Sequence, residues 1–362
     1  MQELTETSYS RIQWIDAAKL VGIFFVVWAH MEGKVPIYLF AAFYMPLFFM
    51  LSGYVEKKRS FSETLRNSFF QLMVPYFALN SIAAIFRLFS FIVFHLMESG
   101  TIDLYKAAKK IAEYIIGIII ADTTEFSFFP CGPCWFLFSL FQMKLLFSFI
   151  STTVKKRFKT ILVLLSVVMV FLAWLLCLKG IKIYFVVNET LMGFVFYVTG
   201  FLMKNFLSEI FNKKNKYDFL IIAVLLFAYF LFVFFSIKKS YGLPNLRGGV
   251  MPGQSIFSIL HYYTGGLLGS WFLIFICKYI FLSKLPEYLS KNTLSILAYH
   301  WIFLSNIKHM YEGLIGKKLY LDYIPSFIFA LVILILCVIP TYISEKYFPF
   351  VIGKKKSRNN SE

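Results

Sequence analysis

The sequence predicts an all-α protein whose helices cross a membrane about ten times. Of its 362 residues, 59% are hydrophobic and only 15% are charged, whereas about one quarter of the residues of a soluble domain are charged. Apolar stretches of about 20 residues, the length that crosses a bilayer, recur along the chain. Helices are expected because they satisfy their own backbone hydrogen bonds in lipid, where water cannot.

Ten apolar stretches are candidate spans. Between the third and the fourth lies a longer segment, in which Leu104 to Ile120 is amphipathic in its first half and apolar in its second. This pattern predicts an interfacial or re-entrant helix rather than a further full span. The fourth span begins at Pro133, a residue that suits a helix start. The ten spans are placed at 14–33, 37–56, 69–97, 133–150, 160–178, 188–206, 219–237, 255–277, 294–311 and 325–344.

The basic residues predict the orientation. The formal net charge is +17, and Lys and Arg form short clusters after the second, fourth, sixth and last spans. Ten spans put both termini on one side, and the positive-inside rule makes that side the cytoplasm. We therefore expect a cytoplasmic segment at 1–13, a single transmembrane domain at 14–345 and a basic cytoplasmic tail at 346–362. Charge distributed in this way also argues against a nucleic-acid-binding protein.

The first span carries three ionisable residues, in the stretch RIQWIDAAKLVGIFFVVWAHM at 11–31. Eleven positions separate Lys19 from His30, which brings them to within about 20° on a helix and roughly 16 Å apart along its axis. Asp16 lies on the same stripe. An ionisable residue inside a membrane costs about 2.5–3.5 kcal/mol on insertion scales and therefore indicates a functional site.

Each of the three residues also has a structural interpretation. His30 could hydrogen-bond to a neighbouring helix, and Lys19 could extend its ammonium group to the cytoplasmic headgroups. Asp16 could pair with Lys19 three residues later or complement the helix dipole.

Other polar residues in apolar surroundings are weaker candidates for an acceptor site or cavity. Arg87, inside the third span, needs an anion or carbonyl partner, in a structural pair or in a substrate. Trp135 suits an interfacial anchor or a sugar-stacking platform, and His300 suits core packing or a cavity wall. Glu32 lies about 200° from His30 if the helix continues, so it would face the outer headgroups or the acceptor. Ser52 could allow close helix packing with Gly53 or form an acyl-enzyme.

Of the five cysteines, only Cys131 and Cys134 are close in sequence, in the motif CGPC. We expect structural thiols or a structural disulfide. No second cysteine pair or nearby histidine completes a zinc set, so no metal site is expected.

Several landmarks occur in order along nearly the whole chain. They are Lys19 and His30, MPLFFMLSGY (45–54), VPY (74–76), PCWFL (133–137), GFVFYVTGFLMK (193–204) and LSILAYHWIF (294–303). In these features the chain resembles the acyltransferase-3 family of integral-membrane acyltransferases, especially the branch that is similar to fucose 4-O-acetylases.

The resemblance implies an O-acyltransferase of the bacterial cytoplasmic membrane. Members of the family move an acyl group, usually acetyl, from cytoplasmic acyl-CoA to hydroxyls of envelope glycans and related acceptors, such as lipid-linked sugars. His30 is then the catalytic histidine and Lys19 its motif partner, with Asp16 orienting Lys19. A neutral imidazole can take the hydroxyl proton near pH 7. Acyl-CoA is the donor substrate, and because its thioester is already activated, no bound cofactor or metal is expected.

Two features depart from the family's pattern. Many members carry an Arg-x-x-Arg pair before the third-span proline, where this chain has SFFQ at 68–71. Tyr44 stands where the fucose-acetylase-like branch often has a histidine, and its hydroxyl could still contact the acceptor. A basic cluster in this loop could bind the phosphates of CoA, or it could reflect the positive-inside rule alone. The cluster consists of Lys57, Lys58, Arg59 and Arg66.

Two other classes of protein fit the same pattern. A carrier or flippase would use the polar stripe as a substrate path and would need no acyl-CoA. A non-catalytic partner in polysaccharide assembly would tolerate the loss of His30. The sequence makes no prediction of oligomeric state.

Overall fold

The computed structural model describes residues 13–121, 128–211, 216–238 and 256–355. The named elements in these ranges are all helices, and the β contact among them is an isolated bridge between Gly33 and Leu321. Together with the apolar helices described below, this confirms the prediction of a polytopic, all-α membrane protein.

The α-helices of the described ranges are numbered along the chain. In chain order they are α1 (Gln13–Ala29), α2 (Tyr44–Tyr54), α3 (Phe61–Ser68), α4 (Val74–Ser99), α5 (Leu104–Ile120), α6 (Trp135–Thr153), α7 (Phe158–Leu178), α8 (Val187–Leu202), α9 (Lys204–Phe211), α10 (Asp218–Lys238), α11 (Ile256–Cys277), α12 (Lys284–Lys291), α13 (Thr293–Ile315), α14 (Tyr323–Leu336) and α15 (Val338–Tyr347). Short 3₁₀ turns lie at Ile37–Leu39, Gly132–Cys134 and Pro349–Ile352, and a π-helical turn at Phe69–Met73 joins α3 to α4.

Seven helical stretches of the described chain are long and apolar enough to cross a bilayer, and an eighth is added if α8 and α9, which meet at a 50° bend, form one span. Two predicted spans fall outside this set. α1 is short, at 17 residues, and α13 carries Asn306, Lys308 and Glu312 among its apolar residues. The count of ten spans stays a prediction.

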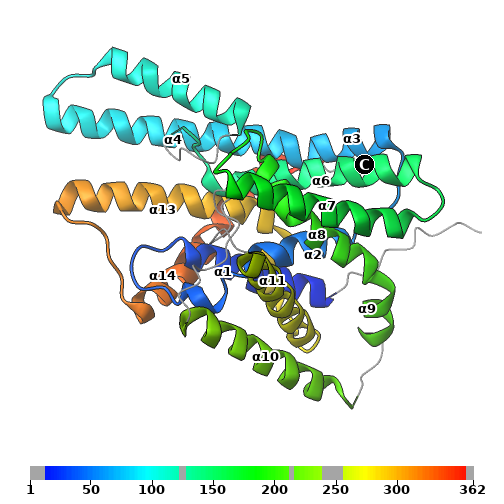
Figure 1. Cartoon of the computed structure of the whole chain (residues 1–362). Coiled ribbons are helices and arrows are strands. Elements are labelled where there is room, and N and C mark those ends of the chain that lie inside the picture. The colour runs from blue at the N-terminus through cyan, green and yellow to red at the C-terminus, as the bar shows by residue number, and fades with distance from the viewer. Residues whose placement is uncertain (1–12, 122–127, 212–215, 239–255, 356–362) are drawn as a thin grey trace, which may run out of the picture.

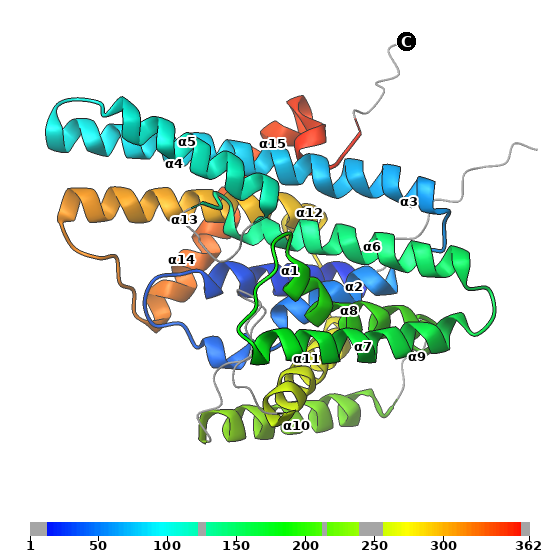
Figure 2. The same cartoon turned by 45° about the horizontal axis from the view of Figure 1, so that its top comes forward.

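The long helices run side by side between two ends of the molecule (Figure 1; Figure 2). α1 lies in the middle, in contact with α2, α11, α12, α13 and α14. α5 is found where the sequence predicts an amphipathic helix, and it runs back along α4 in both views. Its interfacial position stays a prediction.

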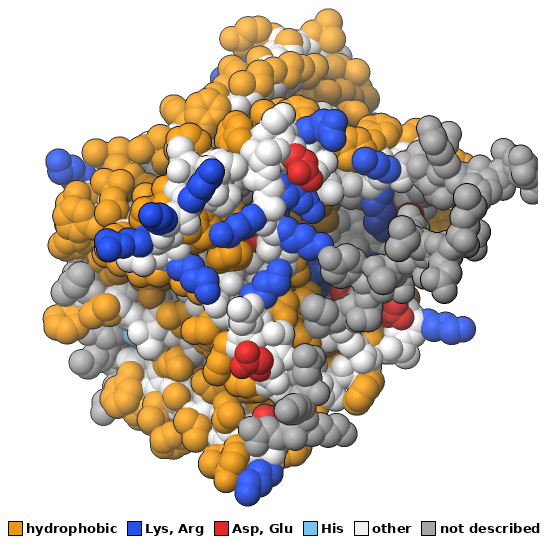
Figure 3. Space-filling model, turned by 90° about the vertical axis from the view of Figure 1, so that its right-hand side faces the viewer, with side chains coloured by type: hydrophobic (Ala, Val, Ile, Leu, Met, Phe, Trp, Pro, Cys, Tyr) orange, Lys and Arg blue, Asp and Glu red, His pale blue; other side chains and the backbone are white. Residues whose placement is uncertain are grey.

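One end of the molecule is rich in basic residues. α1, α3 and α7 begin there, and α2 and α6 end there (right-hand side of Figure 1). Figure 3 views this end and shows Lys and Arg side chains gathered over it. The exposed clusters at 57–59 and 155–157 belong to the two loops between these helices. The predicted cytoplasmic side would carry such a surface, although the orientation itself stays a prediction.

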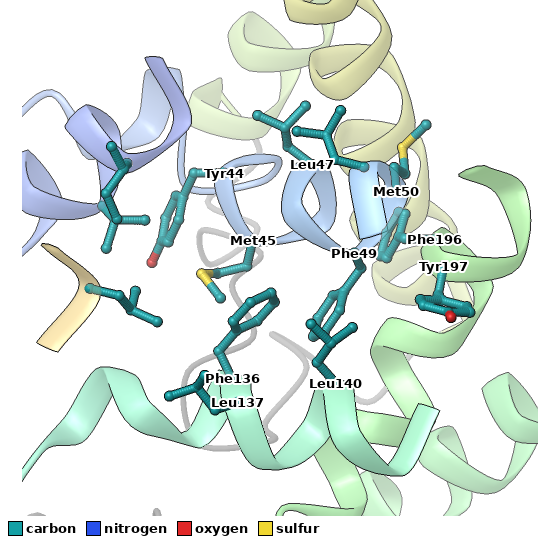
Figure 4. Close-up of a cluster of buried hydrophobic side chains, with 14 of the residues drawn as sticks. Tyr44, Met45, Leu47, Phe49, Met50, Phe136, Leu137, Leu140, Phe196 and Tyr197 are labelled. Atoms are coloured by element: carbon teal, nitrogen blue, oxygen red, sulfur yellow. The ribbon is translucent and has the colours of Figure 1, made fainter. Parts of the chain in front are cut away.

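Glycines bring α2 and α8 into close contact. A Cβ atom built on Gly53 would lie 1.9 Å from the carbonyl oxygen of Tyr197, and one built on Gly200 would lie 1.9 Å from that of Met50. Only residues without side chains allow backbones to approach so closely, as we expected for Gly53. Apolar side chains of α2 point towards α6 and α8 and fill the core there (Figure 4).

Buried ion pairs fasten helices near the basic end. The carboxylate of Glu56, which is 6% exposed, accepts hydrogen bonds from Lys144 and Tyr197 and so joins α2, α6 and α8. Lys278 and Tyr279 likewise donate to Asp218 and join α10 to the end of α11. Removing one partner of such a pair leaves a buried charge uncompensated. These pairs therefore hold helices together on the side where α1 begins.

Candidate active site

The polar stripe of α1 faces the interior of the protein, as its register predicts. Asp16 is 4% exposed and Ile23 and Val27 are buried, while the Lys19 ammonium lies 3.9 Å from the Asp16 carboxylate. The expected pairing of Asp16 with Lys19 is therefore present. Asp16 fixes Lys19 at the basic end of the stripe, and His30 lies at the other end.

His30 follows directly after the last residue of α1. Its Nδ1 lies 2.6 Å from the carbonyl oxygen of Val26, one of the carbonyls that a helix end leaves without an intrahelical donor. Because a carbonyl only accepts hydrogen bonds, Nδ1 carries the hydrogen and Nε2 carries the lone pair of the neutral ring. This is the tautomer in which Nε2 can act as a general base.

A second imidazole lies against His30. The ring of His300, on α13, has its centroid 5.2 Å from that of His30, and its Nδ1 lies 2.7 Å from the carbonyl oxygen of Ile296. His300 is fully buried, and its Nε2 has no hydrogen-bond partner among the described residues. The structure thus places His300 beside the catalytic candidate, in the wall behind it.

Trp301 follows His300 on α13, and the CGPC turn together with Pro130, the residue before it, positions its side chain. Its indole Nε1 donates to the carbonyl oxygen of Pro130 at 3.0 Å, and its ring lies over Gly132 and 5.3 Å from His30. Cys131 and Cys134 are buried free thiols, which is one of the two states expected for them. The motif therefore supports the wall of the site.

His30 opens into a cavity of about 250 Å³, which we call the outer cavity. Glu32 lines the same cavity, and Lys308 pairs with it at 2.7 Å. The expectation that Glu32 points away from the His30 face is wrong. It assumed a helix to residue 33, whereas α1 ends at Ala29 and the chain turns. The polar side chains on this cavity are His30, Glu32, Arg87, Trp301, Ser305, Lys308 and His309.

Lys19 lines a different cavity, of about 240 Å³, which we call the inner cavity. Most of its wall is apolar, with Phe136 and Leu297 among the lining residues, and Ser52 contributes a hydroxyl. As far as the described residues go, the inner and outer cavities have no lining residue in common. The α1 stripe thus has a separate cavity at each end.

Contacts of Gly33 and Lys34 with Leu321 and Asp322, which we call the latch, hold the rim of the outer cavity. The backbone N–H of Lys34 donates to the carbonyl of Leu321 at 2.8 Å, and the Lys34 ammonium lies 2.7 Å from Asp322. The hydrogen bond to Asp322 raises the pKa of Lys34 above its ordinary value. Gly33 adopts a φ of +119° at this point, and a Cβ there would lie 2.1 Å from the Leu321 carbonyl oxygen. The chain after His30 is therefore fixed against the α13–α14 connection.

Several predicted site residues lie outside these two cavities. Tyr44 is buried against Phe40, and Trp135 is half-buried and packs on Phe49. The basic cluster between α2 and α4 is exposed on the surface and, among the described contacts, lines neither cavity. Lys58 lies over the ring of Phe158 and Arg59 pairs with Glu63. The candidates in that cluster are Lys57, Lys58, Arg59 and Arg66.

Sequence reasoning missed the polar face of α13. Trp301, Ser305, Lys308 and His309 all line the outer cavity. Ser305 lies four residues after Trp301 and three or four residues before Lys308 and His309, which places them on one side of the helix. The same periodicity argument that selects Lys19 and His30 on α1 would have found this shared face, had it been applied to α13.

Comparison with known protein families decides the class. A family model of the acyltransferase-3 domain, described as an acyltransferase domain, matches residues 12–343. The chain belongs to the acyltransferase-3 family. No curated protein and no solved structure shows significant similarity to it.

Membership of the acyltransferase-3 family makes this protein a membrane acyltransferase. The match covers α1, with both ends of its polar stripe, and α13, with His300 and Trp301. It confirms the resemblance at the level of the family, and the fucose 4-O-acetylase-like branch stays a prediction.

Proposed function

We propose that the protein is an O-acetyltransferase of a bacterial cytoplasmic membrane. It moves an acetyl group from cytoplasmic acetyl-CoA to a hydroxyl of an envelope glycan or lipid-linked sugar. The observation that carries the proposal is the position of His30, with the Nδ1 hydrogen directed to Val26, at the edge of a polar cavity and on the same stripe as Lys19.

The reaction follows from the geometry of His30. The acceptor hydroxyl lies in the outer cavity and gives its proton to Nε2 as its oxygen attacks the thioester carbonyl. The new C–O bond forms, the C–S bond breaks, and the protonated imidazole gives the proton to the CoA thiolate that leaves. The step balances with acetyl-CoA and the acceptor alone, and no oxidant or reductant is needed.

The donor enters at the basic end. The inner cavity is mostly apolar, which suits an acyl group and the uncharged arm of CoA that carries it. Lys19 lies at the wall of this cavity and can attract a phosphate of CoA. Because roughly 16 Å of helix separates Lys19 from His30, the arm must pass the buried side chains of Ile23 and Val27. Their movement is part of the proposed cycle.

The first prediction concerns His30→Ala in purified protein reconstituted into vesicles with labelled acetyl-CoA and an extract of envelope glycans. We expect transfer of label to fall about 100-fold or more, because general-base catalysis contributes about 10²–10⁴ in rate. The matched control is His261→Ala, at a histidine that bonds Ser236 between α10 and α11 and is expected to keep wild-type transfer.

Wild-type transfer by correctly inserted His30→Ala would contradict this mechanism and would favour a non-catalytic role. A carrier gives a different result in the same vesicles. It would move sugar across the bilayer without acetyl-CoA and would form no ester.

A further inference from the structure

A third cavity, of about 630 Å³, lies between α4, α5 and α13, and we call it the lateral cavity. Residues at helical spacing on one face of α4 line it, namely Arg87, Ser90, Phe91, Phe94 and His95, together with Lys110 and Tyr114 of α5 and His309, Glu312 and Gly313 of α13. Arg87 and His309 also line the outer cavity. The two cavities therefore meet at these two side chains.

The outer cavity is small for a binding site on its own. Pockets that hold ligands typically have volumes of about 300–1,000 Å³, whereas the outer cavity has about 250 Å³. Joined to the lateral cavity, it falls within that range. An acceptor that is longer than one sugar would then occupy both.

Arg87 is placed to bind an anion where the cavities meet. Its guanidinium lies over the ring of Trp301 on α13, at 6.0 Å from the ring centroid. The lysines nearby are held by carboxylates, Lys308 by Glu32 at 2.7 Å and Lys110 by Glu113 at 2.8 Å. A planar guanidinium suits bidentate recognition of a carboxylate or phosphate better than an ammonium group does.

The rest of the lateral cavity suits a sugar. Phe91 and His95 stack with ring centroids 5.8 Å apart, and Phe94 lies against Gly313, where a Cβ would come within 2.0 Å of its ring. Ser90 donates to Asn306 at 2.6 Å and so ties α4 to α13. Aromatic faces beside a few fixed polar groups are the usual lining of a small-molecule site.

We propose that the outer and lateral cavities form one acceptor site for an anionic glycan. The sugar to be acylated lies beside His30, and the adjoining part of the acceptor lies in the lateral cavity, with its carboxylate or phosphate on Arg87. This inference rests on the proposed function, because it takes the outer cavity as the place of the reacting hydroxyl.

Binding without catalysis tests the inference. The full-length protein in phosphatidylcholine nanodiscs, without any CoA, is heated with glucose, glucuronate or glucose 1-phosphate, and the ligand-induced shift of Tm is titrated. We expect stabilisation by glucuronate or glucose 1-phosphate but not by glucose. The anion that stabilises identifies the group as a carboxylate or a phosphate.

Variants locate the effect. Arg87→Gln is expected to weaken binding of the anionic sugar about tenfold or more, as the loss of a charge-assisted pair does. Arg87→Lys is expected to weaken this binding less. The matched control, Arg157→Gln, changes an exposed arginine in the loop between α6 and α7 and is expected to bind as wild type. If Arg87→Gln fails to fold, the comparison of anionic with neutral sugar in the wild type remains decisive.

Three results of the sugar titrations would overturn the inference. They are equal stabilisation by neutral and anionic sugars, no stabilisation by either anion, and an anion effect that Arg87→Gln leaves unchanged. If phosphatidylglycerol in the nanodisc replaces the sugar anions in an Arg87-dependent way, the cavity is a lipid site and the acceptor assignment falls. Arg87-dependent binding of a sugar that is never acylated would instead count against the proposed function.

Discussion

At the scale of single residues, the site is built from side chains that satisfy helix ends and helix carbonyls. His30 and His300 each direct Nδ1 to the carbonyl four residues earlier, which defines Nε2 as the atom that carries the lone pair. A buried polar atom without a partner costs stability. Among the described residues, the buried Nε2 of His300 has no hydrogen-bond partner, so this atom costs stability rather than contributing to it.

The corresponding prediction concerns His300→Phe. The aromatic ring keeps the contact with His30, while the buried nitrogen without a hydrogen bond disappears. We expect Tm to be unchanged or raised and acyl transfer to fall about tenfold, equivalent to about 1.4 kcal/mol in the barrier. Full activity would show that His300 serves only to fill the core.

At the scale of elements, the end of α1 decides which residues share the site. α1 stops at Ala29, and the turn that follows brings Glu32 to the cavity that His30 lines. The Gly33–Leu321 bridge then holds this turn against the connection from α13 to α14. Leu319 and Leu321 of that connection also line the outer cavity, so the latch and the site are one structure.

Gly33→Ala tests the latch. A Cβ would meet the Leu321 carbonyl oxygen at 2.1 Å, so the rim has to move. Gly316→Ala is the matched control, because its φ is also positive, at +68°, but nothing lies within 4 Å of the new Cβ. We expect Gly33→Ala to lower both Tm and acyl transfer more than Gly316→Ala, which carries only the backbone cost of about 1–2 kcal/mol. Equal losses in the two variants would contradict a latch at the rim.

At the scale of the whole molecule, α1 carries one cavity at each end of its polar stripe. The inner cavity lies near the basic end, where the Glu56 and Asp218 ion pairs fasten the surrounding helices. The outer cavity lies beyond His30. Donor and acceptor therefore approach α1 from opposite ends in the proposed reaction.

Ser52 separates the donor side from the acceptor side experimentally. Ser52→Phe fills part of the inner cavity, so we expect the KM for acetyl-CoA to rise about tenfold, or ~1.4 kcal/mol, with the KM for the acceptor unchanged. Ser52→Ala is the control and is expected to keep full activity, because Ser52 and His30 line different cavities. Loss of activity in Ser52→Ala would support an acyl-enzyme at this serine instead.

Much of the fold could be predicted from the sequence because its signals are local. Hydropathy over about 20 residues indicates the membrane helices, and the 100° step of a helix places Lys19 and His30 on one interior stripe. The small residue Gly53 predicts the close contact of α2 with another helix. The family landmarks are local motifs too, and their order along the chain sufficed to name the family that the match over 12–343 confirms.

What the tertiary structure alone decided are contacts between residues far apart in the chain. Helical periodicity gives the face of a helix but not the neighbour that covers it. Packing brings Trp301 and His300 to His30, and it puts Arg87 where two cavities meet. Packing also leaves Tyr44, Trp135 and the basic cluster at 57–66 outside the cavities that His30 and Lys19 line. The sequence by itself determined a membrane acyltransferase with a polar stripe on its first helix. Each family landmark, and the stripe itself, can be recognised within a single segment. The partners of that stripe depend on how all the helices fill space together, and no single segment contains that information.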